Sequence, residues 1–208
     1  MQWGNRLKSC INRYKFVNLH TLLKQGKPTI KTKERMTWFV MRDLTRANAN
    51  RPAWKLLEES GFHVFTPMVW KIRQRGNRKE RDFVPVIHDL LFVNSTREQL
   101  DPVVERVPTL QYRFVKGGSY GQAMVVNNEE MNRFIKAVSS SEDVLYYSPT
   151  EITPHMIGKK VEIIGGPLNG MAGNLLSIRG MRKRRLIVEL PGMLTSAVEV
   201  SPDYIKFI

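Results

Sequence analysis

Five short β-strand patterns follow one another in the last quarter of the chain, at residues 160–164, 174–178, 185–190, 195–200 and 204–207. Glycine and proline turns separate them at close intervals, and β-branched residues are frequent within them. A segment this short can protect its strand edges by closing the strands into a small barrel. We therefore predict an all-β barrel over residues 155–208.

The preceding hundred residues have a mixed pattern. Apolar, β-branched runs predict strands at 37–42, 62–66, 90–94 and 111–115, and a basic hairpin at 68–84 with its tip at 75–78. Helical patterns lie at 50–60, 96–104 and 128–138, the first with Asn50 as a candidate N-cap. These elements predict an α+β domain over 36–138, with helices packed on an antiparallel sheet. The polar run SSSED at 139–143 opens a predicted linker over 139–154.

The positive charge is unevenly distributed. Residues 1–35 carry a net charge of +8, whereas residues 36–150 and 151–208 carry +3 each. The first segment has too little apolar surface for a core. We expect it to be a disordered tail or a start-site artefact, with translation beginning at Met36; a basic arm on nucleic acid is the alternative.

Several classes of protein are disfavoured by what the sequence lacks. It has no apolar run of about 20 residues and no signal-peptide pattern, so we expect no membrane span. A single cysteine, Cys10, cannot form an internal disulfide or a cysteine-based zinc site, which favours the cytoplasm. The four histidines are scattered, and no serine sits in a GxSxG elbow. We expect no catalytic residues, no metal site, no cofactor and no enzymatic activity.

The glycine-rich stretch at 165–173 (GGPLNGMAG) joins two predicted strands. It lacks the Gly-Lys-Ser/Thr ending and the following helix of a phosphate-binding loop. Together with VEII at 161–164, it resembles a KOW motif, which is a strand, a glycine-rich turn and a second strand. A plain glycine-rich hairpin is the alternative.

The order of elements strengthens this resemblance. WFV at 38–40, FTP at 65–67, the basic hairpin, VP at 84–85 and LFV at 91–93 resemble the N-terminal domain of NusG-type transcription factors, with a KOW module after a linker. The resemblance covers about residues 37–208. It is closest to the UpxY antiterminators of capsular polysaccharide loci, at 86–93 and 128–135. Housekeeping members have a Pro-Gly-Tyr turn where this chain has His88-Asp89-Leu90.

The resemblance implies three interaction surfaces. The polymerase-docking surface would include Leu90, Phe92, Tyr112 and Phe114, although each is equally compatible with an ordinary sheet core. The hairpin would contact nucleic acid through Lys71, Arg73, Arg75, Arg78, Lys79 and Arg81, unless these form a solvated face. The KOW partner surface would include Leu168, Met171, Arg182, Lys183 and Arg184, where barrel capping and a solvated loop are the alternatives.

From this resemblance we expect a monomeric, operon-specific antitermination factor. Its partners would be the clamp coiled coil of the largest RNA polymerase subunit, non-template DNA or nascent RNA, and a ribosomal protein or Rho at the KOW module. A housekeeping NusG and a KOW-type ribosomal RNA-binding protein are the alternatives. A nucleic-acid-modifying enzyme would need a clustered catalytic set, which the sequence does not show.

Overall fold

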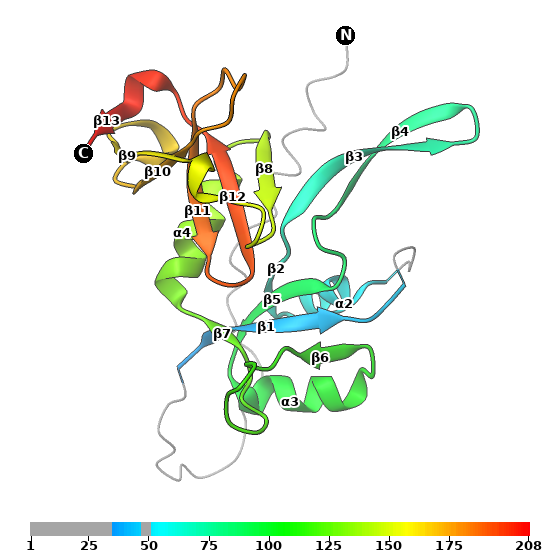
Figure 1. Cartoon of the computed structure of the whole chain (residues 1–208). Coiled ribbons are helices and arrows are strands. Elements are labelled where there is room, and N and C mark those ends of the chain that lie inside the picture. The colour runs from blue at the N-terminus through cyan, green and yellow to red at the C-terminus, as the bar shows by residue number, and fades with distance from the viewer. Residues whose placement is uncertain (1–34, 47–50) are drawn as a thin grey trace. The chain divides into compact units, whose positions relative to one another are not determined.

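The computed structural model describes residues 35–46 and 51–208, except for the side chain of Arg75 (Figure 1). Residues 1–34 of the predicted basic tail and the predicted cap Asn50 lie outside the described residues. Residues 35–208 cluster as one unit.

The N-terminal sheet is antiparallel and centres on β1 (Thr37–Asp43). Its strand order is β2 (His63–Phe65), β5 (Leu90–Ser95), β1 and β6 (Leu110–Tyr112), and β7 (Val125–Val126) also pairs with β1. Because both faces of the sheet are covered, β1 and β5 are apolar almost throughout instead of alternating with polar residues. The predicted α+β fold of this region is confirmed.

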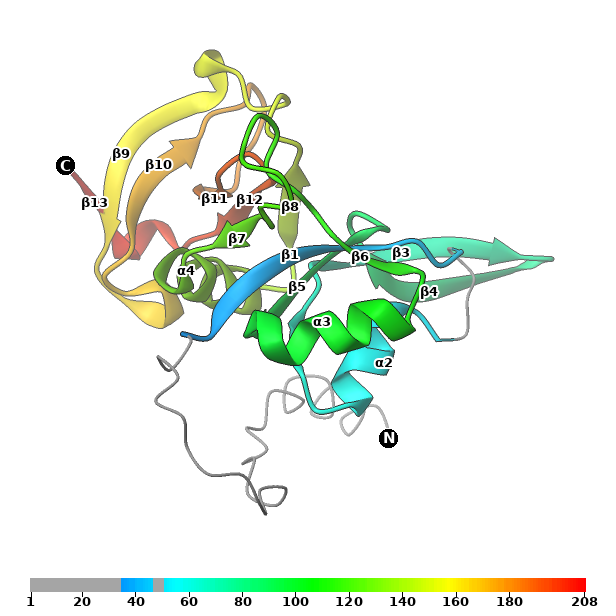
Figure 2. The ribbon, with the colours of Figure 1, turned by 90° about the horizontal axis from the view of Figure 1, so that it is seen from below.

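Two helices, α2 (Ala53–Glu59) and α3 (Arg97–Arg106), lie on the same side of this sheet (Figure 2). A cluster that includes Phe39 of β1, Leu57 of α2 and Leu100 of α3 fills the space between them.

A buried carboxylate holds the start of α2. Asp43, 3% exposed, accepts hydrogen bonds from the backbone N–H of Ala53 at 2.6 Å, from that of Thr45 at 2.9 Å, and from the Thr45 hydroxyl at 2.7 Å. Asp43 therefore accepts a hydrogen bond from a backbone N–H in the first turn of α2, although it lies ten residues before that N–H in the sequence. In most helices an N-cap residue next to the first turn makes this bond.

Asp43→Ala is expected to lower the free energy of unfolding by about 2 kcal/mol or more, because it leaves these donors without their acceptor. Urea unfolding followed by circular dichroism measures the change, with Glu105→Ala on the exposed side of α3 as the control. A loss equal to that of the control would contradict the capping role.

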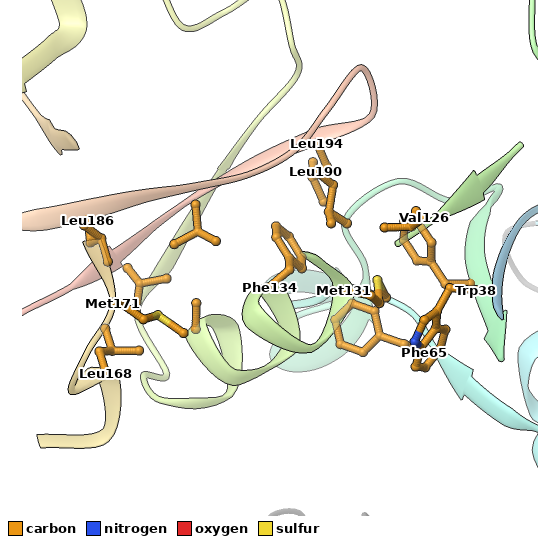
Figure 3. Packing of buried hydrophobic residues seen from close by; sticks show 14 of the residues in the cluster. Trp38, Phe65, Val126, Met131, Phe134, Leu168, Met171, Leu186, Leu190 and Leu194 are labelled. Carbon is orange, nitrogen blue, oxygen red and sulfur yellow. The ribbon is translucent and has the colours of Figure 1, made fainter. Parts of the chain in front are cut away.

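Helix α4 (Asn128–Ser139) lies between the two sheets of the chain. Its N-cap is Asn127, whose side chain accepts from the backbone N–H of Glu129 at 2.8 Å. Its buried residues Met131, Phe134 and Ala137 belong to one cluster with residues of the N-terminal sheet and of the C-terminal strands. Figure 3 shows Phe134 within this cluster, with Leu190, Leu194, Phe65 and Trp38 to one side of it and Leu168, Met171 and Leu186 to the other.

The C-terminal region contains the five predicted strands. They are β9 (Ile157–Ile163), β10 (Ala172–Leu176), β11 (Arg185–Leu190), β12 (Leu194–Glu199) and β13 (Ile205–Phe207). A sixth strand, β8 (Val144–Tyr147), makes the order β13-β9-β10-β11-β12-β8. The prediction that this region is all-β with antiparallel strands is confirmed. Within the described part of the chain no pairing joins β13 to β8, so the ladder of hydrogen bonds is open between these two strands. We call these strands the C-terminal sheet; α4 packs against its strands β11 and β12.

Strand β8 lies inside the segment 139–154 that was predicted as a linker. Because it pairs with β12, residues 144–147 are part of the C-terminal sheet. Arg185, 4% exposed, donates to the Asp143 carboxylate at 2.7 Å and to the Asp143 carbonyl. Lys183 donates to the same carboxylate at 2.9 Å and to Glu199 at 2.7 Å. Polar residues that are typical of a linker thus attach the start of β8 to the sheet.

These hydrogen bonds predict a pH dependence. Those from Lys183 and then Arg185 lower the pKa of the Asp143 carboxyl. A lowered pKa stabilises the folded state above the ordinary pKa of about 4, and this contribution is lost as the pH falls through the lowered value. The stability difference between the natural chain and Asp143→Asn is therefore expected to be constant from about pH 5 to 7 and to shrink below about pH 4. Urea unfolding across this range measures it, and a constant difference down to pH 2 would contradict it.

Candidate interaction surfaces

The four residues predicted for polymerase docking do not lie together. Leu90 and Phe92 are 2% and 0% exposed and belong to the cluster around α4. Tyr112 lies on the opposite face of the sheet, in the cluster beneath α2 and α3. Phe114 is 53% exposed and contacts the Tyr112 ring at a centroid distance of 6.4 Å. Leu90 and Phe92 are therefore buried on the face that α4 covers, whereas Tyr112 is buried on the other face and Phe114 is exposed.

Tyr112 makes specific contacts within the domain. Its hydroxyl donates to Asp101 of α3 at 2.7 Å, and the Arg97 guanidinium lies 4.7 Å from its ring centroid. Burial, followed by the hydrogen bond to Asp101, raises the pKa of Tyr112 well above its usual value, so the hydroxyl remains a donor. These contacts attach α3 to the sheet.

The departure from the Pro-Gly-Tyr turn has a structural role. Asp89 accepts from Nε of Arg42 at 3.0 Å and forms an ion pair with Arg113 at 3.2 Å. Two cationic side chains, one from β1 and one from the residue that follows β6, therefore converge on this one carboxylate. The ion pairs fix the turn that leads into β5 and hence the position of Leu90.

The basic hairpin consists of β3 (Met68–Arg75) and β4 (Arg78–Pro85), which extend away from the N-terminal sheet (Figure 1). The strand register places the predicted nucleic-acid residues on two opposite faces. Lys71, Arg73 and Arg78 share one face with the acidic residues Glu80 and Asp82, and Arg73 pairs with Asp82 at 3.5 Å. Lys79 and Arg81 lie on the other face, while the side chain of Arg75 lies outside the description.

Sequence reasoning missed three exposed apolar residues on that second face. They are Trp70, Ile72 and Phe83, which are 43%, 71% and 49% exposed. The alternation of Trp70 and Ile72 with Lys71 and Arg73 was the available signal, because it predicts one apolar and one basic face.

The predicted KOW partner residues are also divided. Leu168 and Met171 are buried in the cluster with α4, because the short helix η2 (Gly166–Leu168) turns that loop toward α4. Lys183 is engaged by Asp143 and Glu199, whereas Arg182 and Arg184 are exposed. The exposed apolar residues near the glycine-rich turn are Ile164, Tyr204 and Phe207, which the sequence did not single out.

No helix among the described residues is both long and apolar enough to span a membrane. In the same ranges, no group of three or more histidine, cysteine, aspartate or glutamate residues could hold a metal ion.

Comparison with known families identifies the N-terminal domain. Residues 36–135 match the family model described as transcription termination factor NusG. No curated protein gives a significant match. The matched range contains the antiparallel N-terminal sheet with α2 and α3, and it ends within α4. The N-terminal domain, which is just under half of the chain, is therefore similar to the NusG family of transcription termination factors, a family of non-enzymatic proteins.

Proposed function

We propose that this chain docks on RNA polymerase in the cytoplasm and suppresses pausing and termination at particular operons. The observation that carries the proposal is the NusG match over residues 36–135, on a region with the α+β fold expected for it. The resemblance of residues 86–93 and 128–135 to capsular-locus antiterminators supports operon specificity. The factor would act mechanically, by binding the polymerase clamp and displaced nucleic acid.

The docking face would include Leu90 and Phe92. Both side chains are buried in the cluster that also contains Phe134 of α4 and Leu190 and Leu194 of the C-terminal sheet. A coiled coil could contact them only after part of this cluster separates. We therefore propose that the C-terminal sheet moves away from α4 when the chain binds polymerase.

The contact between α4 and the C-terminal sheet is suited to such a separation. Apolar side chains form it, together with a hydrogen bond from Arg133 to the carbonyl of Ala172. Apolar contacts can re-form on another apolar surface without leaving buried polar groups unpaired. The released C-terminal sheet could then bind a ribosomal protein or Rho, with Arg182 and Arg184 among its exposed residues.

Because Phe92 is buried, a substitution at this position is a poor test of docking. A charge at Phe92 would lie in a core position, so Phe92→Asp would unfold the domain instead of removing one contact. Variants at the contact between α4 and the C-terminal sheet are more informative.

Operon specificity is tested by transcription in vitro with purified polymerase. We expect the chain to increase read-through of a terminator placed behind the leader of its own operon, and to leave an unrelated leader unchanged. Equal read-through on both templates would instead indicate a general elongation factor.

A further inference from the structure

The two faces of the β3–β4 hairpin differ in their chemistry. Cross-strand neighbours in an antiparallel pair share a face, and the register pairs Trp70 with Phe83, Ile72 with Arg81 and Gln74 with Lys79. We call these six residues the aromatic face. The opposite face carries Lys71, Arg73 and Arg78 together with both acidic residues of the hairpin.

The aromatic face presents two rings to solvent. The Trp70 and Phe83 rings lie with their centroids 4.8 Å apart and their planes at 39°, and the Arg81 guanidinium is 5.0 Å from the Trp70 centroid. Both rings are nearly half exposed, and neither belongs to a buried cluster of the described residues. The rings pack on each other but leave surface for a further contact.

Charge identifies the kind of partner. Glu80 and Asp82 lie on the opposite face, so Lys79 and Arg81 share the aromatic face with no carboxylate. On the other face the acids offset part of the positive charge, and Arg73 is paired with Asp82. Rings flanked by cations without acids favour a partner that has both flat apolar surfaces and negative charge.

We propose that the aromatic face is a stacking platform for single-stranded nucleic acid. Bases would stack on Trp70 and Phe83, and Arg81 and Lys79 would contact the adjoining phosphates. A duplex hides its base faces within the helix and could use only the cations. The inference deepens the proposed function, because it names the strand contact that the hairpin makes beside the transcription bubble.

The test uses the full chain and labelled oligothymidine and oligouridine of about 12 nucleotides, with a duplex of equal length. Fluorescence anisotropy measures each dissociation constant at several salt concentrations. Trp70→Ala and Phe83→Ala are expected to weaken single-strand binding at least about fivefold each, with little change for the duplex. Trp70→Phe keeps a ring and is expected to bind nearly as the natural chain does.

A matched pair of arginines separates the two faces. Arg81→Ala is expected to weaken single-strand binding and to reduce the salt slope by about 1, whereas Arg73→Ala is expected to do so less because Asp82 already engages Arg73. Residues 1–35 carry +8 and add a salt-sensitive background that is common to all variants. The bound strand is expected to quench tryptophan fluorescence, and the part of this quenching that Trp70→Phe loses reports on the hairpin, because Trp3 in the basic segment is unchanged in that variant.

The proposal is overturned if the natural chain binds neither single strand, or if the folded Trp70→Ala and Phe83→Ala variants bind single strands as tightly as the natural chain does. It is also overturned if these variants lose binding to polymerase but keep binding to single strands. The last would assign the aromatic face to a protein contact. A preference for oligothymidine would identify displaced DNA as the ligand, and a preference for oligouridine would identify RNA. Polymerase binding is measured separately, so a failure of the docking proposal is distinguishable from a failure of this one.

Discussion

Phe134→Ala is expected to lower the free energy of unfolding by about 3–5 kcal/mol, the usual cost of removing a fully buried phenylalanine. Phe134 is 0% exposed, and its ring meets Phe65 edge-on at a centroid distance of 6.2 Å. It also lies beside Leu190 and Leu194 of the C-terminal sheet (Figure 3). The substitution therefore removes contacts to both sheets at once and leaves a cavity between them.

Urea unfolding of the full chain measures this effect. Asn132→Ala, on the exposed side of the same helix, is the matched control and is expected to change stability by less than about 0.5 kcal/mol. A loss below about 1 kcal/mol for Phe134→Ala would show that α4 does not hold the two sheets together as the structure has it.

Leu194→Asp is expected to increase the affinity for RNA polymerase, even though it removes an apolar contact. Leu194 is 1% exposed in the cluster shared with α4, so a carboxylate there favours separation of the C-terminal sheet from α4. If only a fraction of the molecules is open, the apparent dissociation constant exceeds the intrinsic one by the inverse of that fraction. A chain that is open about one-tenth of the time would gain about tenfold.

Equilibrium binding to core polymerase tests this expectation. Pro191→Asp adds the same charge at an exposed position of the same turn and is expected to bind as the natural chain does. Leu194→Ala is a milder variant, for which a smaller gain is expected. Unchanged or weaker binding by both Leu194 variants, with the N-terminal domain folded, would contradict coverage of the docking face by the C-terminal sheet.

Local patterns predicted most elements of the fold. The apolar run of β5, the cap at Asn127 and the five strands from β9 to β13 each have a signature within a few residues. Strand β8 was not predicted, because the polar residues 139–143 before it are typical of a linker. Its pairing partner, β12, lies about fifty residues further along the chain, so no local pattern indicates the pairing. The buried Arg185 that binds Asp143 looks in sequence like one member of a basic run.

The candidate site was less predictable for a related reason. The alternation of a strand shows that neighbouring residues face opposite ways, but it does not show which face another element covers. Leu90 and Phe92 were recognisable as apolar, whereas their burial depends on residues far along the chain, such as Phe134 of α4 and Leu194 of the C-terminal sheet. In the hairpin, the alternation of the apolar residues Trp70 and Ile72 with basic residues was visible in the sequence, but the prediction considered only the number of basic residues.

The most direct test of the central claim is equilibrium binding of the full chain to RNA polymerase core enzyme, with the isolated clamp coiled coil as competitor. We expect saturable one-to-one binding that the coiled coil inhibits. No saturable binding by a chain shown to be folded, together with tight, salt-sensitive binding to ribosomal RNA, would contradict docking on polymerase and favour a ribosomal RNA-binding protein.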